Sequence, residues 1–150
     1  MLKNRQRNAF TLLEIVPVLT VASLLLMIIL SALNPSEWFA EARNTKRKHH
    51  ISVIADSIIE YSRDNDLSLL YQMPENSQEI CADILTGNCA GLFDINVVIG
   101  TYMDSVPIDP SSQDESLTNE HSRYFIIRSG QRFTVSAPDA EIGATIEVTR

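Results

Sequence analysis

Three hydropathy patterns divide this chain, and each predicts a different kind of structure. Residues 10–33 form an unbroken apolar run with one charged side chain, Glu14. From Ser36 to about Asn65, apolar residues recur at the three- and four-residue spacing of an amphipathic helix. Near the C-terminus, apolar residues alternate with other residues as in β-strands, in residues 123–129, 131–137 and 144–149.

The apolar run is long enough to be a membrane-spanning helix. As a helix, residues 10–33 would extend about 36 Å, which exceeds the hydrocarbon thickness of a bilayer. Pro17 lies inside the run and removes one backbone hydrogen bond, so we expect a kink there. A secretory signal peptide fits less well, because residues 31–33 do not form the usual pattern of small residues at a cleavage site. A plain membrane anchor stays open as an alternative.

Residues 34–65 predict a second helix, which starts where the apolar run ends. Asn34 can cap a helix, Pro35 suits the first helical position, and Glu37 completes a spacing like that of a capping box. We therefore expect the helical spine to break or bend at this point. Trp38 lies where an aromatic residue of the membrane interface belongs. An apolar stripe farther along should pack on the rest of the protein; it consists of Ile51, Ile54, Ala55, Ile58 and Ile59.

The residues after the spine predict a small head. Residues 66–91 are rich in turn formers, with room for a short helix over 77–85, and residues 92–102 fit either a short helix or a strand. The sequence Pro107-Ile108-Asp109-Pro110 should end any regular element. The polar, acidic stretch 111–122 should be an exposed loop.

The last part of the head carries the strongest strand signal. Two alternating segments flank Ser129-Gly130, which predicts a β-hairpin, and residues 144–149 can add a third strand. A long N-terminal helix packed on a small C-terminal antiparallel sheet is an α+β arrangement. We expect four segments: a leader (1–9), a transmembrane helix (10–33), its soluble continuation (34–65) and a globular head (66–150).

Charge and cysteine content limit the functions of the head. The chain has 150 residues and a formal net charge of −7. Between Ile51 and Ser122 there is one basic residue, Arg63, against thirteen acidic ones. Such a surface repels a phosphate backbone, so we expect no nucleic-acid binding by the head.

Cys81 and Cys89 should form a disulfide if the head is exported to an oxidising compartment.

Candidate metal sites are weak. His49 and His50 are adjacent, so on a helix they point about 100° apart and cannot hold one ion together. Asp109, Asp114 and Glu115 could supply oxygen ligands to calcium, but an exposed acidic loop is the more common explanation of such a stretch. We therefore predict no metal and no other cofactor.

The remaining polar residues do not form a recognisable enzyme site. The sequence has no nucleophile elbow and no phosphate-binding loop, and His121 reads as a surface residue. The basic residues Arg43, Lys46, Arg47 and Lys48 could bind anionic lipid headgroups or DNA. We interpret them instead as a solvated helix face that complements acidic neighbours. The chain is therefore not expected to be an enzyme.

The most specific feature is the beginning of the apolar run. A basic leader with Lys3, Arg5 and Arg7 precedes Ala9-Phe10-Thr11-Leu12-Leu13-Glu14. This stretch resembles the class III cleavage and methylation signal of type IV prepilins and type II secretion pseudopilins. The family pattern has a basic leader, a small residue (usually glycine), Phe-Thr-Leu-x-Glu and an apolar helix. Ala9 replaces the usual glycine here, and Pro17 comes earlier than the proline of many family members.

The resemblance implies a pilin-like fold and a set of processing steps. A prepilin peptidase would cut between Ala9 and Phe10 on the cytoplasmic side and methylate the new Phe10 amine. Glu14 would pair with the Phe10 amine of a neighbouring subunit. The Pro-x-Asp-Pro step before the last strands is a second, less specific similarity to pseudopilin heads.

The resemblance also implies partners and a location. An inner-membrane platform protein and an assembly ATPase would lift like subunits out of the membrane lipid into a helical filament. The precursor would be a single-pass inner-membrane protein with its leader cytoplasmic and its head outside, and the product a cell-surface or periplasmic filament. The alternatives are a single-pass anchored binding protein that never polymerises and, more weakly, a membrane-tethered enzyme.

Overall fold

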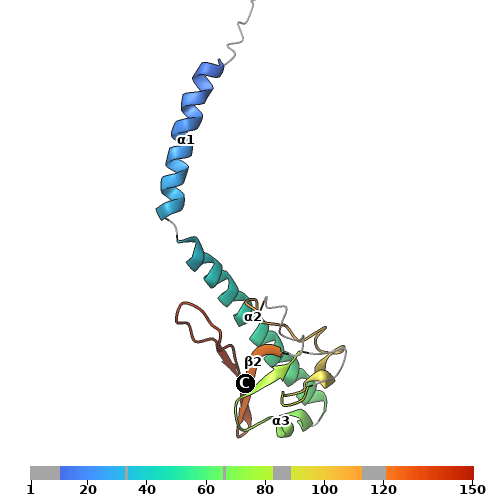
Figure 1. The fold of residues 1–150 in the computed structure, drawn as a ribbon. Coiled ribbons are helices and arrows are strands. Elements are labelled where there is room, and N and C mark those ends of the chain that lie inside the picture. Colours follow the sequence, from blue (N-terminus) through green and yellow to red (C-terminus); the bar gives the residue numbers. More distant parts are fainter. Residues whose placement is uncertain (1–10, 33, 66, 83–88, 113–120) are drawn as a thin grey trace, which may run out of the picture. The chain divides into compact units, whose positions relative to one another are not determined.

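The architecture was analysed in a computed structural model, which describes residues 11–32, 34–65, 67–82, 89–112 and 121–150. The chain divides into two compact units, Met1–Trp38 and Phe39–Arg150. We call the second of these the globular unit, and we describe each unit separately. The helices are α1 (Leu12–Ala32), α2 (Pro35–Asp64) and α3 (Ser68–Gln72), with one 3₁₀ turn, η1 (Asn96–Val98); the strands are β1 (Gln78–Cys81), β2 (His121–Ser129), β3 (Arg132–Ser136) and β4 (Glu147–Thr149) (Figure 1).

Helix α1 consists almost entirely of the predicted apolar run. It continues through Pro17, and hydroxyl groups of the helix bond back to its own carbonyl groups, for example Thr20 Oγ1 to the Pro17 oxygen at 2.8 Å. Among the described residues, α1 is the one helix long and apolar enough to cross a membrane. None of its residues is buried.

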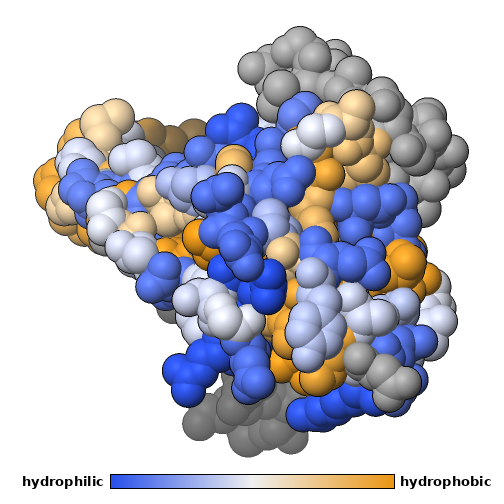
Figure 2. Space-filling view, turned by 90° about the horizontal axis from the view of Figure 1, so that it is seen from below, coloured by the Kyte–Doolittle hydropathy of each residue, from blue (hydrophilic) through white to orange (hydrophobic). Residues whose placement is uncertain are grey.

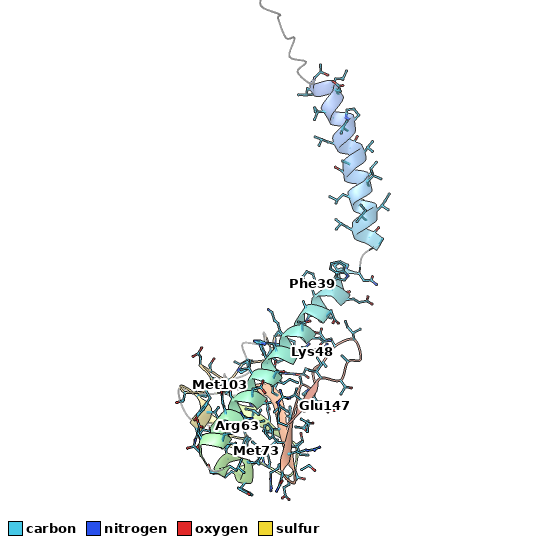
Figure 3. All side chains as sticks on the ribbon, turned by 180° about the vertical axis from the view of Figure 1, so that it is seen from behind. Phe39, Lys48, Arg63, Met73, Met103 and Glu147 are labelled. Carbon is cyan, nitrogen blue, oxygen red and sulfur yellow. A yellow bond between two sulfur atoms is a disulfide. The ribbon has the colours of Figure 1, made fainter. Side chains whose placement is uncertain are left out.

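Helix α2 begins where the sequence predicts. Asn34 is not helical, and its carbonyl oxygen accepts a hydrogen bond from the Glu37 amide at 3.1 Å, which closes the first turn. The predicted break between two helices is therefore confirmed. The predicted stripe is also confirmed, since Ile51, Ile54 and Ile58 are buried. Figure 3 shows Phe39 toward one end of this helix and Arg63 near the other.

The sheet has four antiparallel strands in the order β1-β2-β3-β4. The predicted hairpin is confirmed: Phe125 pairs with Ser136 and Ser129 with Arg132, with Gly130 in the left-handed conformation at the turn. The predicted third strand is present as the shorter β4, which pairs with β3. The buried side chains of α2 and of the sheet join in one hydrophobic core, so the α+β class is confirmed.

Two local predictions were wrong. Residues 78–81, assigned to a short helix, form strand β1, because they pair with residues of β2 that lie 40 to 48 positions later in the chain. The exposed loop predicted for 111–122 ends too late, since β2 begins at His121 and Ser122 is fully buried. Of residues 92–102, only the turn η1 is helical. The parts of these predictions in residues 83–88 and 113–120 lie outside the described residues.

Candidate assembly helix and charged cluster

Helix α1 presents its apolar side chains on every side. Fourteen large apolar residues are exposed along it, and no residue of the helix is buried. Exposed apolar surface on this scale is unfavourable in water at about 25 cal/mol per Å². The helix is long and apolar enough to span a membrane.

Glu14 lies in the first turn of this helix. Its amide donates to the Thr11 carbonyl oxygen at 3.1 Å, and its carboxylate is near the positive end of the helix dipole, which favours an acid there. The predicted cleavage and methylation positions, Ala9 and Phe10, lie outside the described residues. The structure thus places Glu14 at the start of α1, and it does not describe Phe10, whose amine the family resemblance pairs with Glu14.

The globular unit contains a charged cluster, which we define as Arg43, Asn44, Arg47, Asp109, Ser111 and Glu141. At its centre the Arg47 guanidinium binds Asp109 with two bonds, Nε to Oδ2 at 2.7 Å and Nη2 to Oδ1 at 3.0 Å. Both side chains have 0% exposure. Arg47 projects from α2, whereas Asp109 comes from the Pro-Ile-Asp-Pro segment, so the pair fixes that segment to the helix.

Glu141 completes the cluster from the loop between β3 and β4. Its carboxylate accepts bonds from Arg43, at 2.6 and 2.7 Å, and from Arg47 at 2.9 Å. The Asn44 amide also binds the Glu141 backbone twice, donating to its carbonyl oxygen at 2.8 Å and accepting from its amide at 3.0 Å. The cluster therefore attaches two separate loops to one face of α2.

The charges within the cluster are balanced, and their pKa values shift accordingly. Burial alone would raise the pKa of Asp109, but hydrogen bonds from Arg47 and Ser111 outweigh it and leave that pKa below its ordinary value. Hydrogen bonds from Arg43 and Arg47 lower the pKa of Glu141 to about 2. The two arginines and the two carboxylates of the cluster are therefore all ionised at neutral pH, which suits a structural role and not acid–base chemistry near pH 7.

The basic stretch of α2 was predicted to be a solvated face, and this is wrong for half of it. Arg47 is buried and Arg43 is half-buried in an ion pair, whereas Lys46 and Lys48 are exposed. The carboxylates that cover the arginines lie 62 and 98 residues away in the chain, so local spacing could not reveal them. One feature of the sequence hinted at these carboxylates: Asp109 is an acidic residue that lies between two prolines.

One of the three residues considered as calcium ligands, Asp109, is bound to other groups. Asp109 is fully engaged by Arg47 and Ser111, and Asp114 and Glu115 lie outside the described residues. In the described part of the chain, no group of three or more His, Cys, Asp or Glu residues is arranged to hold a metal ion.

The histidines take separate structural positions. His50 is half-buried, with Nδ1 2.8 Å from the Tyr124 hydroxyl oxygen, and burial lowers its pKa, assisted by the neighbouring His49. His49 is exposed. His121 is partly exposed and its Nδ1 lies 2.9 Å from Glu79. His50 and His121 therefore each contact a side chain of the same unit, Tyr124 and Glu79, and these contacts involve no metal.

A disulfide joins Cys81 to Cys89, as the sequence predicts, with the Cα atoms 5.6 Å apart.

Next to β1, a polar recess of about 310 Å³ is lined by Glu79, His121, Arg123 and Asp139 together with Phe125 and Pro138. Its charged groups bond to each other: Arg123 Nε donates to Asp139, and Glu79 accepts from the Arg123 amide at 2.8 Å. No local sequence pattern predicted this recess, because its residues come from three separate segments of the chain.

Comparison of the chain with models of protein families, with curated proteins and with solved structures found no match.

Proposed function

We propose that this chain is a structural subunit, a pilin or pseudopilin, of a type IV pilus-like or type II secretion filament. The observation that carries the proposal is α1, an apolar helix with no buried residue, whose single charged side chain is Glu14. The motif from Ala9 to Glu14 resembles a prepilin signal, and it stands directly at the start of this helix. A subunit that moves from lipid into a helical bundle needs a helix of this kind.

The proposed processing generates the partner that Glu14 needs. Cleavage between Ala9 and Phe10 by a prepilin peptidase would create a free amine, which the peptidase would then methylate. An ammonium and a carboxylate are each costly to desolvate, and pairing recovers part of that cost. In a filament, the Phe10 amine of one subunit and Glu14 of the next would therefore compensate each other among apolar helices.

The globular unit is consistent with the head of such a subunit. The buried stripe of α2 packs with a four-stranded antiparallel sheet in one core, and a disulfide closes the segment after β1. Under the proposal, this unit lies outside the cytoplasm, where a disulfide persists. An assembly ATPase and a platform protein in the inner membrane would supply the work of extraction, and the subunit would perform no reaction of its own.

The N-terminus of the mature protein tests this proposal. Mass spectrometry of the protein from its native membrane should give a chain that begins at methylated Phe10. Ala9→Gly should be cut at least as well as the native chain, whereas a bulky residue in Ala9→Leu should crowd the peptidase site and leave the precursor uncut. Filaments built normally from chains that still carry residues 1–9 would show that the proposal is wrong.

A second candidate function is an anchored binding protein, and the polar recess beside Glu79 and Arg123 is the observation that favours it. Arg123 adopts a left-handed backbone conformation, φ 64°, within β2, and strain of this kind occurs often at functional sites. This function requires no cleavage after Ala9 and no polymer. The same mass measurement therefore separates it from the filament subunit.

A further inference from the structure

One face of the first turns of α2 is exposed in the globular unit. Phe39, Ala42, Lys46 and His49 are all exposed, and the exposed fraction of Phe39 is 66%. At about 100° per residue, the four side chains lie within about 80° of one another around the helix axis. We call these four residues the outer face of α2. Figure 3 labels Phe39, where the outer face begins.

The outer face combines apolar and basic residues and is separated from the nearby acids. Glu37 and Glu41 lie about 120–160° away around the helix, on the same side as the exposed Lys48. Farther along the helix, Asp56 is nearer to the line of the outer face, but it pairs with Arg150 at 2.8 Å. Seen from below, the globular unit shows hydrophobic areas scattered among hydrophilic residues, which is ordinary for a protein surface (Figure 2). The outer face differs because its residues follow the helix spacing.

Lys46 is the positive charge that the outer face presents. The guanidinium groups of Arg43 and Arg47, on the same helix, are neutralised by Glu141 and Asp109. Within the described part of the chain, Lys46 forms no ion pair. An exposed aromatic ring and a lysine seven residues later, on one helix face without an acid, suit the surface of an anionic bilayer.

The chain itself brings a bilayer to the outer face. Helix α1, which is long and apolar enough to cross a membrane, ends at Ala32. Phe39 follows Ala32 by seven residues, so the Cα atoms of the two are at most about 24 Å apart. The headgroup layer begins where the hydrocarbon core ends and is about 5–8 Å thick. A bilayer crossed by α1 is therefore held within reach of the outer face, whereas any other partner has to diffuse to it.

We propose that the outer face of α2 binds the surface of the anionic bilayer that α1 crosses. Phe39 enters the headgroup layer, the Lys46 ammonium contacts lipid phosphates, and α2 lies along the surface as far as His49. This inference rests on the single-pass membrane location in the proposed function, and it names what the globular unit contacts before assembly. An upright α2 would instead carry His49 about 15 Å beyond Phe39, past the headgroup layer.

Nitroxide labels on single introduced cysteines test the contact in the full chain, in vesicles of phosphatidylcholine and phosphatidylglycerol. Two pairs of neighbouring positions each place one label on the outer face and one off it: Ala42→Cys with Glu41→Cys, and His49→Cys with Lys48→Cys. The ratio of collisions with oxygen to collisions with a water-soluble nickel complex should be severalfold higher for the label on the outer face. The reason is that oxygen concentrates in lipid and the nickel complex does not. An upright helix gives equal ratios within each pair, which would overturn the proposal.

Two lysine variants, measured with the labels at positions 41 and 42, separate the outer face from general attraction to charge. Lys46→Gln should bring the two ratios close to equality, and so should vesicles of phosphatidylcholine alone. Lys48→Gln removes the same charge from the other side of the helix and should leave the severalfold difference unchanged. Both lysines are exposed, so neither variant should change the melting temperature. Equal losses in the two variants would contradict a contact through the outer face.

Dilution and processing distinguish the remaining outcomes. Labelled chains are diluted with unlabelled ones, and a difference between labels that disappears on dilution would assign the outer face to a neighbouring copy, against the proposal. Equal ratios in chains that do begin at methylated Phe10 would remove the lipid contact and leave the filament function intact. A lipid contact in native chains that keep residues 1–9 and never polymerise would support this inference and contradict the filament function alone.

Discussion

Helix α1 and the globular unit differ in which side chains they expose and which they bury. Helix α1 leaves its apolar side chains uncovered, whereas the globular unit buries a full ion pair, Arg47 with Asp109, at 0% exposure. The interactions that α1 needs must therefore come from lipid or from other molecules, and those of the charged cluster are complete within one chain. Substitutions in α1 should change assembly, and substitutions in the cluster should change stability.

The largest stability effect should come from Arg47→Met. This change leaves Asp109 buried without its ion partner, which should lower the free energy of unfolding by about 3–5 kcal/mol. Urea unfolding of the full chain in detergent measures it. Lys46→Met, at the exposed neighbour, should stay within about 0.5 kcal/mol of the native chain. If both variants unfold alike, the cluster does not stabilise the fold.

The double variant Arg47→Met with Asp109→Leu sharpens this prediction. Replacing both partners by apolar residues removes the unpaired charge, so much of the lost stability should return. No recovery would mean that the stability depends on the wider network through Glu141 and Asn44 and not on the central pair.

The largest assembly effect should come from Glu14→Ala and Glu14→Gln. Membrane insertion should be equal or better, because a charge leaves the apolar helix. Under the proposed function, filament yield should fall more than tenfold, which corresponds to about 1.4 kcal/mol or more, because the neighbour's Phe10 amine would lose its partner. Glu37→Ala, an acid in the first turn of α2, is the control and should assemble normally. If the Glu14 variants are cleaved normally and give the wild-type yield of filaments, Glu14 has no role in assembly.

A smaller stability effect should follow from opening the disulfide. Cys81→Ser with Cys89→Ser should lower the free energy of unfolding by about 2–3 kcal/mol, because a short closed loop removes only modest entropy from the unfolded chain. A thiol assay on denatured, unreduced protein checks the bond first. Two reactive thiols there would mean that the bond is absent from the native protein.

The smallest effect should be a dependence on pH through His50. Burial lowers its pKa below the ordinary 6.5, so the unfolded chain takes up a proton at higher pH than the folded one does. Stability should therefore fall as the pH drops through about 6.5, and the fall should end below the folded pKa. Thermal melts of the native chain between pH 8 and pH 5 measure this slope. His50→Gln, which can still bond Tyr124, should flatten it, and an unchanged slope would assign the effect to other groups.

The sequence by itself determined the features that depend on local periodicity. The uncharged run predicted α1, the stripe around Ile54 predicted the buried face of α2, and Ser129-Gly130 predicted the hairpin, since each signal lies within a few residues of the structure it specifies. The disulfide between Cys81 and Cys89 was predicted on a different ground, the expected export of the head to an oxidising compartment.

Only the tertiary structure decided which distant segments meet. Strand β1 exists because β2 offers it a partner, and Arg47 is buried because Asp109, 62 residues later, neutralises it. A charged residue on a helix is predicted to be exposed when its counter-ion is not known. A charge is buried only when a partner of opposite charge is buried with it. Local patterns therefore specified the elements, and long-range ion pairing specified how the loops of the globular unit are held.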